Sequence, residues 1–451
     1  MKSRRIVLFI FGVIALLALV CIVFPSDGIK LGPATLRFPS LSEVLGAADS
    51  LDEVVPLSPE EIESQRLARL AAAREDELEH YLRTDSCRIY MPGGNLDYLD
   101  GLFEAFDSAA VRHVRVVHCG DSQLEEDRMT GVLRDSLQSK FGGGGVGLLP
   151  AKRYFTFKIS ETASAEMPEY GIYPEMLRKS GGKYGPLTRM SRLDGGVSLS
   201  FTPTKKNDSA SRYFDRLTVY AGDIAGNLSA SVKGQSQSVT QEGALSRIVF
   251  DLPDSTEKVS LSLSGHADIL GVSLDKSTGV SVDNVPMRGC SGTIFTYLSA
   301  NQLREYYRRS DTRLIILQYG GNSVPAIRTP AGISDYCQSM NRQIELLQDL
   351  APQAAIIFIG PSDMSTSAHR TYAMLPQMVD SLRANVNALG AAYWDLYAAM
   401  GGKESMPRWV KSGLAGPDYI HFTNKGSEKM GAAFADALLL SYEYYKLRKN
   451  K

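Results

Sequence analysis

The sequence of 451 residues is poor in cysteine and carries almost no net charge. Its five cysteines form no CxxC pair and no Cys/His spacing, which argues against a structural zinc site, and they do not indicate the redox compartment. A formal net charge of −1 gives no reason to expect nucleic acid as a partner. Tandem repeats and low-complexity tracts are also lacking. An apolar share of 44% and a charged share of 22% are typical of a globular protein, long enough here for two or three domains.

The N-terminus carries the longest apolar run. Uncharged residues extend from Ile6 to Phe24 behind a basic flank at residues 1–5. This length is enough for a helix to span the roughly 30 Å hydrocarbon core of a bilayer. A cleaved signal peptide is the alternative, but no small-x-small site closes the run, and Val20 does not fit a lipid-anchor motif at Cys21. The sequence predicts a single-pass helix in the cytoplasmic (inner) membrane, with the remaining chain on the periplasmic, extracytoplasmic side.

Most of the chain after residue 111 alternates short apolar runs with amphipathic helical stretches. The runs are Val114–Cys119, Leu314–Gln318, Ala354–Ile359 and Ala391–Leu396, and the helical stretches are Ser334–Leu350, Tyr372–Leu389 and Lys425–Leu447. Apolar strands separated by helices are typical of a parallel sheet that is covered on both faces. The pattern therefore predicts an α/β doubly wound domain, in which sites form at the carboxyl ends of the strands.

Residues 152–282 break this alternation. Period-two segments at 197–201, 216–220, 247–251 and 258–263 are separated by Gly, Asn and Asp clusters, with no convincing helix between them. This pattern predicts an antiparallel β-sandwich inserted into the α/β domain. The predicted domains are residues 1–25 (flank and anchor), 26–85 (tether, then a stalk helix capped by Ser58), 86–151 and 283–451 (α/β domain), and 152–282 (sandwich).

A serine stands where the first strand ends. Gly120-Asp121-Ser122 closes an apolar run, and a charged, helix-prone stretch follows at once. A helix N-terminus at that position would favour developing negative charge. Ser122 is therefore a candidate nucleophile, although a serine at a strand–helix junction can also serve only as a helix cap.

A serine nucleophile needs a base, and His421 is the best placed of the six histidines. It lies in a loop just before the last helical stretch, and Asp418, three residues earlier, can accept a hydrogen bond from one imidazole nitrogen. The alternative is a surface turn in which both residues are incidental. His118 precedes Ser122 within its strand and is expected to be a packed residue.

Acyl transfer also needs hydrogen-bond donors for an oxyanion. Asn322 follows the strand ending at Gln318, and Gly289 lies in a glycine-containing turn after Asp283. Together with the backbone N–H of Ser122, the N–H of Gly289 and the Asn322 amide would form a three-donor hole. Each of these turns could equally be only a turn.

Four blocks follow one another along the chain: Gly120-Asp121-Ser122, the turn at Gly289, Gly320-Gly321-Asn322 (a GxN motif), and Asp418 to His421 (a DxxH motif). In this order they resemble the SGNH (GDSL-type) hydrolase superfamily over most of residues 111–150 and 283–447. The resemblance implies a flavodoxin-like doubly wound sheet and a serine hydrolase without a metal or organic cofactor. It also implies that Ser122 is the nucleophile, His421 the base and Asp418 the orienting acid. Gly289 and Asn322 then join Ser122 as the oxyanion donors.

The sequence departs from the family pattern at two positions. Gln123 replaces the leucine of GDSL, and Ser323 replaces the aspartate that often follows GxN. Neither change is expected to touch the chemistry, but both argue against a lipase-type substrate. Residues 120–150 resemble envelope-associated bacterial members with an inserted sandwich, such as peptidoglycan O-acetylesterases, in which the sandwich resembles a carbohydrate-binding module. Here the sandwich holds Tyr213 and Tyr220 but no tryptophan, so it either stacks on sugars or only walls the cleft.

The expected function is that of a membrane-anchored serine esterase. It would remove small acyl groups, O-acetyl above all, from an envelope glycan through an acyl-enzyme. Two alternatives stay open: an O-acetyltransferase that uses the same triad, and a glycan-binding envelope protein whose site is vestigial. The polymer and the acylated position are not indicated by the sequence.

Overall fold

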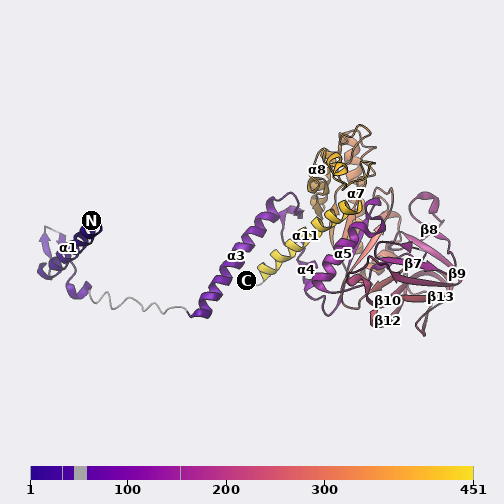
Figure 1. Cartoon of the computed structure of the whole chain (residues 1–451), viewed down its shortest axis with the longest axis horizontal. Coiled ribbons are helices and arrows are strands. Elements are labelled where there is room, and N and C mark those ends of the chain that lie inside the picture. The colour runs from indigo at the N-terminus through magenta and orange to yellow at the C-terminus, as the bar shows by residue number, and fades with distance from the viewer. Residues whose placement is uncertain (1, 33, 45–57, 153, 450–451) are drawn as a thin grey trace. The chain divides into compact units, whose positions relative to one another are not determined.

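The computed structural model describes residues 2–32, 34–44, 58–152 and 154–449. The chain divides into two compact units, Met1–Ala71 and Ala72–Lys451 (Figure 1). The N-terminal unit holds helix α1 (Lys2–Val23) and a small hairpin of β1 (Ile29–Leu31) and β2 (Ala34–Leu36). Among the described residues, no helix combines the length and the apolar composition that crossing a membrane requires. The predicted anchor is thus not confirmed, and residues 45–57 of the predicted tether lie outside the described residues.

Helix α3 (Pro59–Thr84) matches the predicted stalk helix. Ser58 caps it as expected: the backbone N–H of Glu61 donates to Ser58 Oγ at 3.2 Å, and the Glu61 carboxylate accepts from Ser58 N at 2.7 Å. This reciprocal pair is a capping box, which satisfies two donors that the first helical turn would otherwise leave unpaired.

The centre of the predicted α/β domain is a six-stranded sheet. Its order is β14 (Gly279–Pro286), β4 (His113–Gly120), β15 (Thr312–Gln318), β16 (Ala355–Ile359), β17 (Ala392–Trp394) and β3 (Ile89–Tyr90). The first five strands are parallel, and β3 adds an antiparallel edge. The next strand in the chain after β4 within this sheet, β14, lies on one side of β4, and all later strands lie on its other side, beginning with β15. This is the flavodoxin-like order, with its switch point between β4 and β15. The predicted doubly wound sheet is confirmed.

Helices cover both faces of this sheet. One face carries α4 (Asp100–Asp107), α5 (Arg128–Phe141) and α11 (Asn424–Lys449), and the other carries α6 (Ala300–Arg309), α7 (Pro330–Leu350) and α8 (Leu375–Ala388). Alternation along β15 separates the two cores: Leu314 and Ile316 pack on the α5 and α11 side, while Ile315 and Leu317 pack on the α7 and α8 side. Two short helices, α9 (Leu396–Ala399) and α10 (Ser405–Lys411), follow β17.

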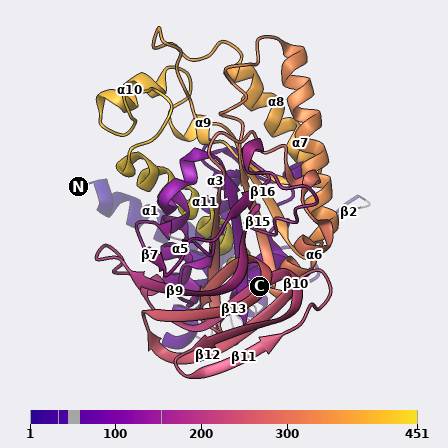
Figure 2. The ribbon, with the colours of Figure 1, turned by 90° about the vertical axis from the view of Figure 1, so that its right-hand side faces the viewer.

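The inserted region forms a second, antiparallel sheet of nine strands, seen below the α/β layers in Figure 2. Its strands are β5 (Gly147–Leu149), β6 (Tyr154–Phe155), β7 (Ile159–Ala163), β8 (Glu169–Gly171), β9 (Arg189–Pro203), β10 (Phe214–Val232), β11 (Gln235–Val239), β12 (Ser246–Thr256) and β13 (Val259–Asp275).

The predicted sandwich of two sheets is instead one continuous hydrogen-bonded sheet around its own core. The long strands β10 and β13 pair along most of their length, with register shifts near Tyr220 and Gly222. Such shifts bend strands, so a single sheet can enclose apolar side chains such as Phe201 and Phe250. The sheet already begins at Gly147, and β14 of the parallel sheet begins at Gly279. The predicted boundaries at 151/152 and 282/283 therefore fall a few residues late.

A buried ion cluster joins the two sheets. Arg115 of β4 is 2% exposed and reaches Asp275 of β13 at 2.5 Å, and it also pairs with Asp283 of β14. Burial alone would raise the pKa of Asp275, but the Arg115 charge outweighs it and the pKa is lowered. Asp283 also accepts from Leu148 N of β5 at 2.9 Å. One guanidinium thus bonds to carboxylates from both sheets, which fixes the inserted sheet to the strands that lead to Ser122.

Candidate active site

The turn after β4 differs from the predicted strand–helix junction. Ser122 opens a short 3-10 helix, Ser122–Asp127, and α5 begins only at Arg128. Glu126 and Asp127 adopt left-handed φ values of 59° and 69°, and these two residues separate the short helix from α5. The cap of the short helix is Asp121, whose carboxylate accepts from Gln123 N at 3.0 Å. Since Asp121 does the capping, the alternative that Ser122 serves only as a helix cap is wrong.

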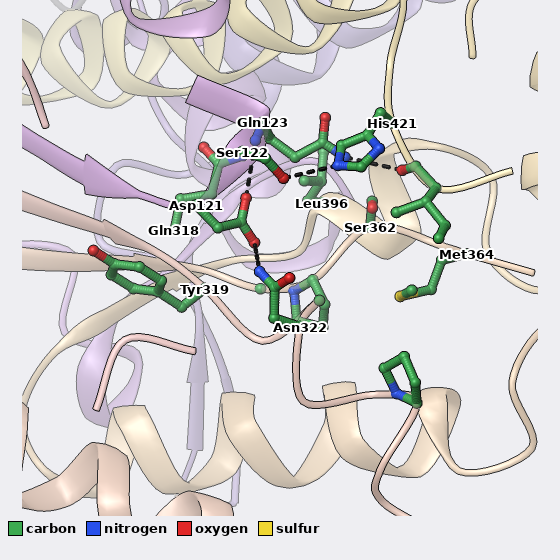
Figure 3. A pocket seen from close by; sticks show the side chains of 15 residues that line it. Asp121, Ser122, Gln123, Gln318, Tyr319, Asn322, Ser362, Met364, Leu396 and His421 are labelled. Carbon is green, nitrogen blue, oxygen red and sulfur yellow. Dashed lines mark hydrogen bonds between the residues drawn. The ribbon is translucent and has the colours of Figure 1, made fainter. Parts of the chain in front are cut away.

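Ser122, His421 and Asp418 form one chain of hydrogen bonds. Ser122 Oγ lies 2.8 Å from His421 Nε2 (Figure 3), and His421 Nδ1 lies 2.7 Å from Asp418 Oδ2. Ser122 comes from the carboxyl end of β4, whereas the other two come from the loop before α11. This is the geometry in which a base can take the proton of a serine hydroxyl while an acid orients the base.

The Asp418 carboxylate is fixed by its own loop. Besides His421 Nδ1, it accepts from the backbone N–H groups of Ile420 at 3.0 Å and of His421 at 3.1 Å. Partial burial acts to raise the pKa of Asp418, but these hydrogen bonds outweigh it, and the pKa is lowered. The carboxylate is therefore ionised at neutral pH, as the orienting partner of a histidine base must be.

His118 is a packed residue, as expected. It is 1% exposed, and its ring nitrogens lie 3.1 Å from Gln318 Oε1 and 3.0 Å from Thr130 Oγ1. Burial lowers the pKa of His118 to about 3. The imidazole is thus neutral and takes no part in the pocket beside Ser122.

Asn322 lies next to Ser122, but its amide is already engaged. Nδ2 donates to Asp121 Oδ2 and to the carbonyl of Cys290, both at 3.1 Å (Figure 3 shows the first of these). Gly289 has a left-handed φ of 78°, and its carbonyl accepts from Tyr173 Oη at 3.0 Å. Gly289 is not among the described residues that line the pocket. A hole in which all three donors converge is not seen, and the oxyanion roles of Gly289 and Asn322 stay predictions.

A small pocket opens beside the Ser122 hydroxyl, with a cavity volume of about 170 Å³. This is below the roughly 300–1,000 Å³ of sites that enclose drug-sized ligands, so it suits a small group. Its lining comprises Asp121, Ser122, Gln123, Gln318, Tyr319, Gly321, Asn322, Pro325, Gly360, Pro361, Ser362, Met364, Leu396, Ile420 and His421. No group of His, Cys, Asp and Glu among the described residues could hold a metal ion.

The residues after β16 that form one wall of the pocket were not predicted from the sequence. Ser362 and Met364 line the pocket because Asp363, which is fully buried, anchors this loop through Thr371 Oγ1 and Met406 N, both at 2.8 Å. The Gly360-Pro361 turn directly after a parallel strand was the available signal, since loops at that edge of the sheet converge on the site.

The Asp121 carboxylate predicts a pH-dependent stability. Burial raises its pKa to about 6 from an ordinary value of 3.8, against the opposing effect of the Gln123 and Asn322 hydrogen bonds. Because the folded pKa is the higher one, stability from this group is present below about pH 4 and is lost as the pH rises through about 6. The free energy of unfolding of Asp121→Asn, taken relative to wild type and measured by denaturant unfolding, should therefore increase by up to about 3 kcal/mol as the pH rises from 4 to 7. A pH-independent difference would contradict this assignment.

A family model described as the GDSL-like Lipase/Acylhydrolase family matches residues 254–429. The matched segment contains Asn322, Asp418 and His421 but not Ser122, which the inserted sheet separates from them along the chain. No curated protein matches the sequence significantly.

A solved structure titled "Peptidoglycan O-acetylesterase in action, 5 min" has the same fold, with a TM-score of 0.65 and 18% identity, covering 80% of this chain and 99% of that chain. A family two carbohydrate esterase from Cellvibrio japonicus has a TM-score of 0.27 and 13% identity, covering 63% and 98% of the two chains. That likeness is too loose to inform the site. Residues 254–429 thus match the GDSL-like acylhydrolase family, the chain shares its fold with a peptidoglycan O-acetylesterase structure, and the Ser122–His421–Asp418 geometry supports an ester-hydrolysing enzyme similar to the SGNH (GDSL-type) hydrolases.

Proposed function

We propose that the protein is a serine esterase that removes small acyl groups, O-acetyl above all, from an envelope glycan. The observation that carries this proposal is the continuous chain of hydrogen bonds from Ser122 through His421 to Asp418. The small pocket beside Ser122 supports a short acyl group, because a longer acyl chain would have to extend out of it. The fold that the chain shares with a peptidoglycan O-acetylesterase supports a glycan as the carrier of that group.

The reaction would run in two halves. Ser122 Oγ attacks the ester carbonyl carbon while its proton passes to His421 Nε2, and the ionised Asp418 stabilises the imidazolium that forms. The tetrahedral intermediate collapses as the bond to the sugar oxygen breaks, and the Nε2 proton goes to that oxygen. Water then attacks the acyl-enzyme and gives its proton to His421, so that the carboxylic acid leaves and the Ser122 hydroxyl is restored.

The oxyanion would be stabilised by Ser122 N–H and by the amide of Asn322. Both Asn322 amide hydrogens already have acceptors, Asp121 Oδ2 and the Cys290 carbonyl. Donation to an oxyanion therefore requires one of these bonds to be shared or exchanged as the negative charge develops. A developing oxyanion is a stronger acceptor than a neutral carbonyl, which favours exchange of the Cys290 bond.

The proposal places the enzyme on the extracytoplasmic side of the cytoplasmic membrane, held there by residues 1–25. Support comes from the sequence alone: a basic flank precedes the apolar run from Ile6 to Phe24. An envelope glycan lies on that side of the membrane, so substrate and location are consistent.

The triad is tested by single substitutions in the full-length protein. Ser122→Ala should abolish hydrolysis of 4-nitrophenyl acetate, and His421→Ala should lower it by about three orders of magnitude or more, because triad members act as a unit. Circular dichroism should show an unchanged fold. Release of acetate from an O-acetylated glycan, with and without an added sugar acceptor, separates hydrolysis from transfer. Wild-type turnover by both variants would rule out the mechanism.

The role of Asn322 is tested by Asn322→Ala. Loss of one oxyanion donor costs about 2.7–4 kcal/mol of transition-state stabilisation. We expect kcat to fall about a hundredfold or more while KM changes little. If Asn322 only ties the turns of Asp121 and Cys290 together, the variant will instead melt at a lower temperature and keep most of its specific activity.

The location is tested by a reporter fused after Lys451. Alkaline phosphatase, which is active only outside the cytoplasm, should be active in this fusion, whereas a β-galactosidase fusion should not. Removing residues 1–25 should reverse the result. Activity of the β-galactosidase fusion alone would contradict the proposed side of the membrane.

A further inference from the structure

The Gln123 side chain connects the serine turn to the histidine loop. Its amide Nε2 donates to the carbonyl of Ile420 at 3.0 Å, and its Oε1 accepts from the backbone N–H of Phe422 at 3.2 Å. These two groups flank His421 on either side. The amide thus pairs with the loop backbone as a neighbouring strand would. Figure 3 shows Gln123 beside Ser122, in the same pocket as His421.

The bond to Phe422 is buried, and the bond to Ile420 is partly buried. Gln123 is 7% exposed, and the Phe422 side chain is 2% exposed. A buried hydrogen bond is costly to leave unmade, so the histidine loop has a defined position relative to Gln123. Since both polar atoms of the Gln123 side chain already bond to the loop, this residue acts through the loop although it also lines the pocket.

Arg128 makes a second connection between the same two segments. Its guanidinium donates to the carbonyl of Ser122 at 2.9 Å and to that of Phe422 at 3.3 Å. From the other side, Ser365 N donates to the carbonyl of Tyr419 at 3.0 Å, and the Tyr419 ring stacks on His369 at 4.0 Å. The loop is therefore held from both sides, and the two contacts from Gln123 are made to the residues directly before and after His421.

We propose that Gln123 is a positioning residue, whose amide sets the His421 ring at hydrogen-bond distance from Ser122 Oγ. The inference rests on the proposed serine-esterase function and adds to it a residue that neither gives nor takes a proton. A leucine at this position, as in the GDSL pattern, fills the space but can form neither bond. The glutamine that stands here in place of leucine therefore affects the position of His421 relative to Ser122.

The test uses the full-length protein and 4-nitrophenyl acetate. Gln123→Leu should lower kcat by about tenfold to a hundredfold, because small misplacements of a catalytic group cost that much, and should leave KM within about twofold. Gln123→Glu keeps an acceptor for Phe422 N but opposes the Ile420 carbonyl with a carboxylate. Its kcat relative to wild type should rise as the pH falls and the new carboxyl becomes a donor.

Gln138→Leu is the matched control. Gln138 is 3% exposed, and its amide also bonds to backbone carbonyls, those of Gly145 at 3.0 Å and Val280 at 3.3 Å, but it lies away from the pocket. This variant should lose thermal stability and keep the wild-type kcat. A kcat loss as large in Gln138→Leu as in Gln123→Leu would overturn the proposal, because both effects would then come from general destabilisation.

A double variant decides whether Gln123 acts through His421. Adding Gln123→Leu to His421→Ala should cause no further loss, since the residue that it positions is gone. An equal loss in the presence and absence of His421 would overturn the proposal, as would a wild-type kcat in Gln123→Leu. Failure of the underlying function looks different: wild type and Ser122→Ala would then hydrolyse the ester equally.

Discussion

The 2.8 Å contact between Ser122 Oγ and His421 Nε2 is the geometric requirement that the fold of the second unit has to meet. The two residues are 299 positions apart, and they meet because both segments reach the carboxyl edge of one parallel sheet. β4 delivers Ser122 to that edge, and the loop before α11 delivers His421. In the flavodoxin-like order, the switch point between β4 and β15 opens a crevice at this place. Asn322, at the end of β15, lies on the other side of it.

The inserted sheet could have disturbed this edge, since it enters the chain between α5 and β14. The buried Arg115 cluster explains why it need not. Arg115 lies five residues before Gly120 on β4. Of its two partners, Asp275 is the last residue of β13 in the inserted sheet, and Asp283 lies within β14. Removing Arg115 would leave two buried carboxylates with no cation between them, so the insertion has one strongly preferred attachment to the α/β layers. At the opposite end, Tyr173 of the inserted region donates to the carbonyl of Gly289, so the insertion also contacts the turn after β14.

The sequence predicted those parts of the molecule that periodicity and motif spacing encode. Alternating apolar strands and amphipathic helices gave the parallel sheet and α7, α8 and α11, and the Asp418–His421 spacing gave the hydrogen bond between them. Contacts made by single side chains over long separations were not predictable. Gln123 reads as a neutral replacement of leucine until the backbone of Ile420 and Phe422 is placed beside it. The interrupted helix after Ser122 was missed because left-handed Glu126 and Asp127 carry no glycine or proline signal. One continuous sheet was read as two because bends in β10 and β13 arise from register shifts that strand alternation does not reveal.

The aspartate in front of the serine also receives a physical role from these contacts. Asp121 caps the short helix through Gln123 N and, with its other oxygen, accepts from the Asn322 amide. The Asp121 carboxylate therefore links the serine turn to the turn after β15. The Gln123 side chain links the serine turn to the histidine loop. A neutral side chain such as asparagine has one acceptor oxygen and could not serve both donors as well. The energetic cost of burying Asp121 is visible in its raised pKa, and the alignment of three separate loops around one hydroxyl group is the structural result.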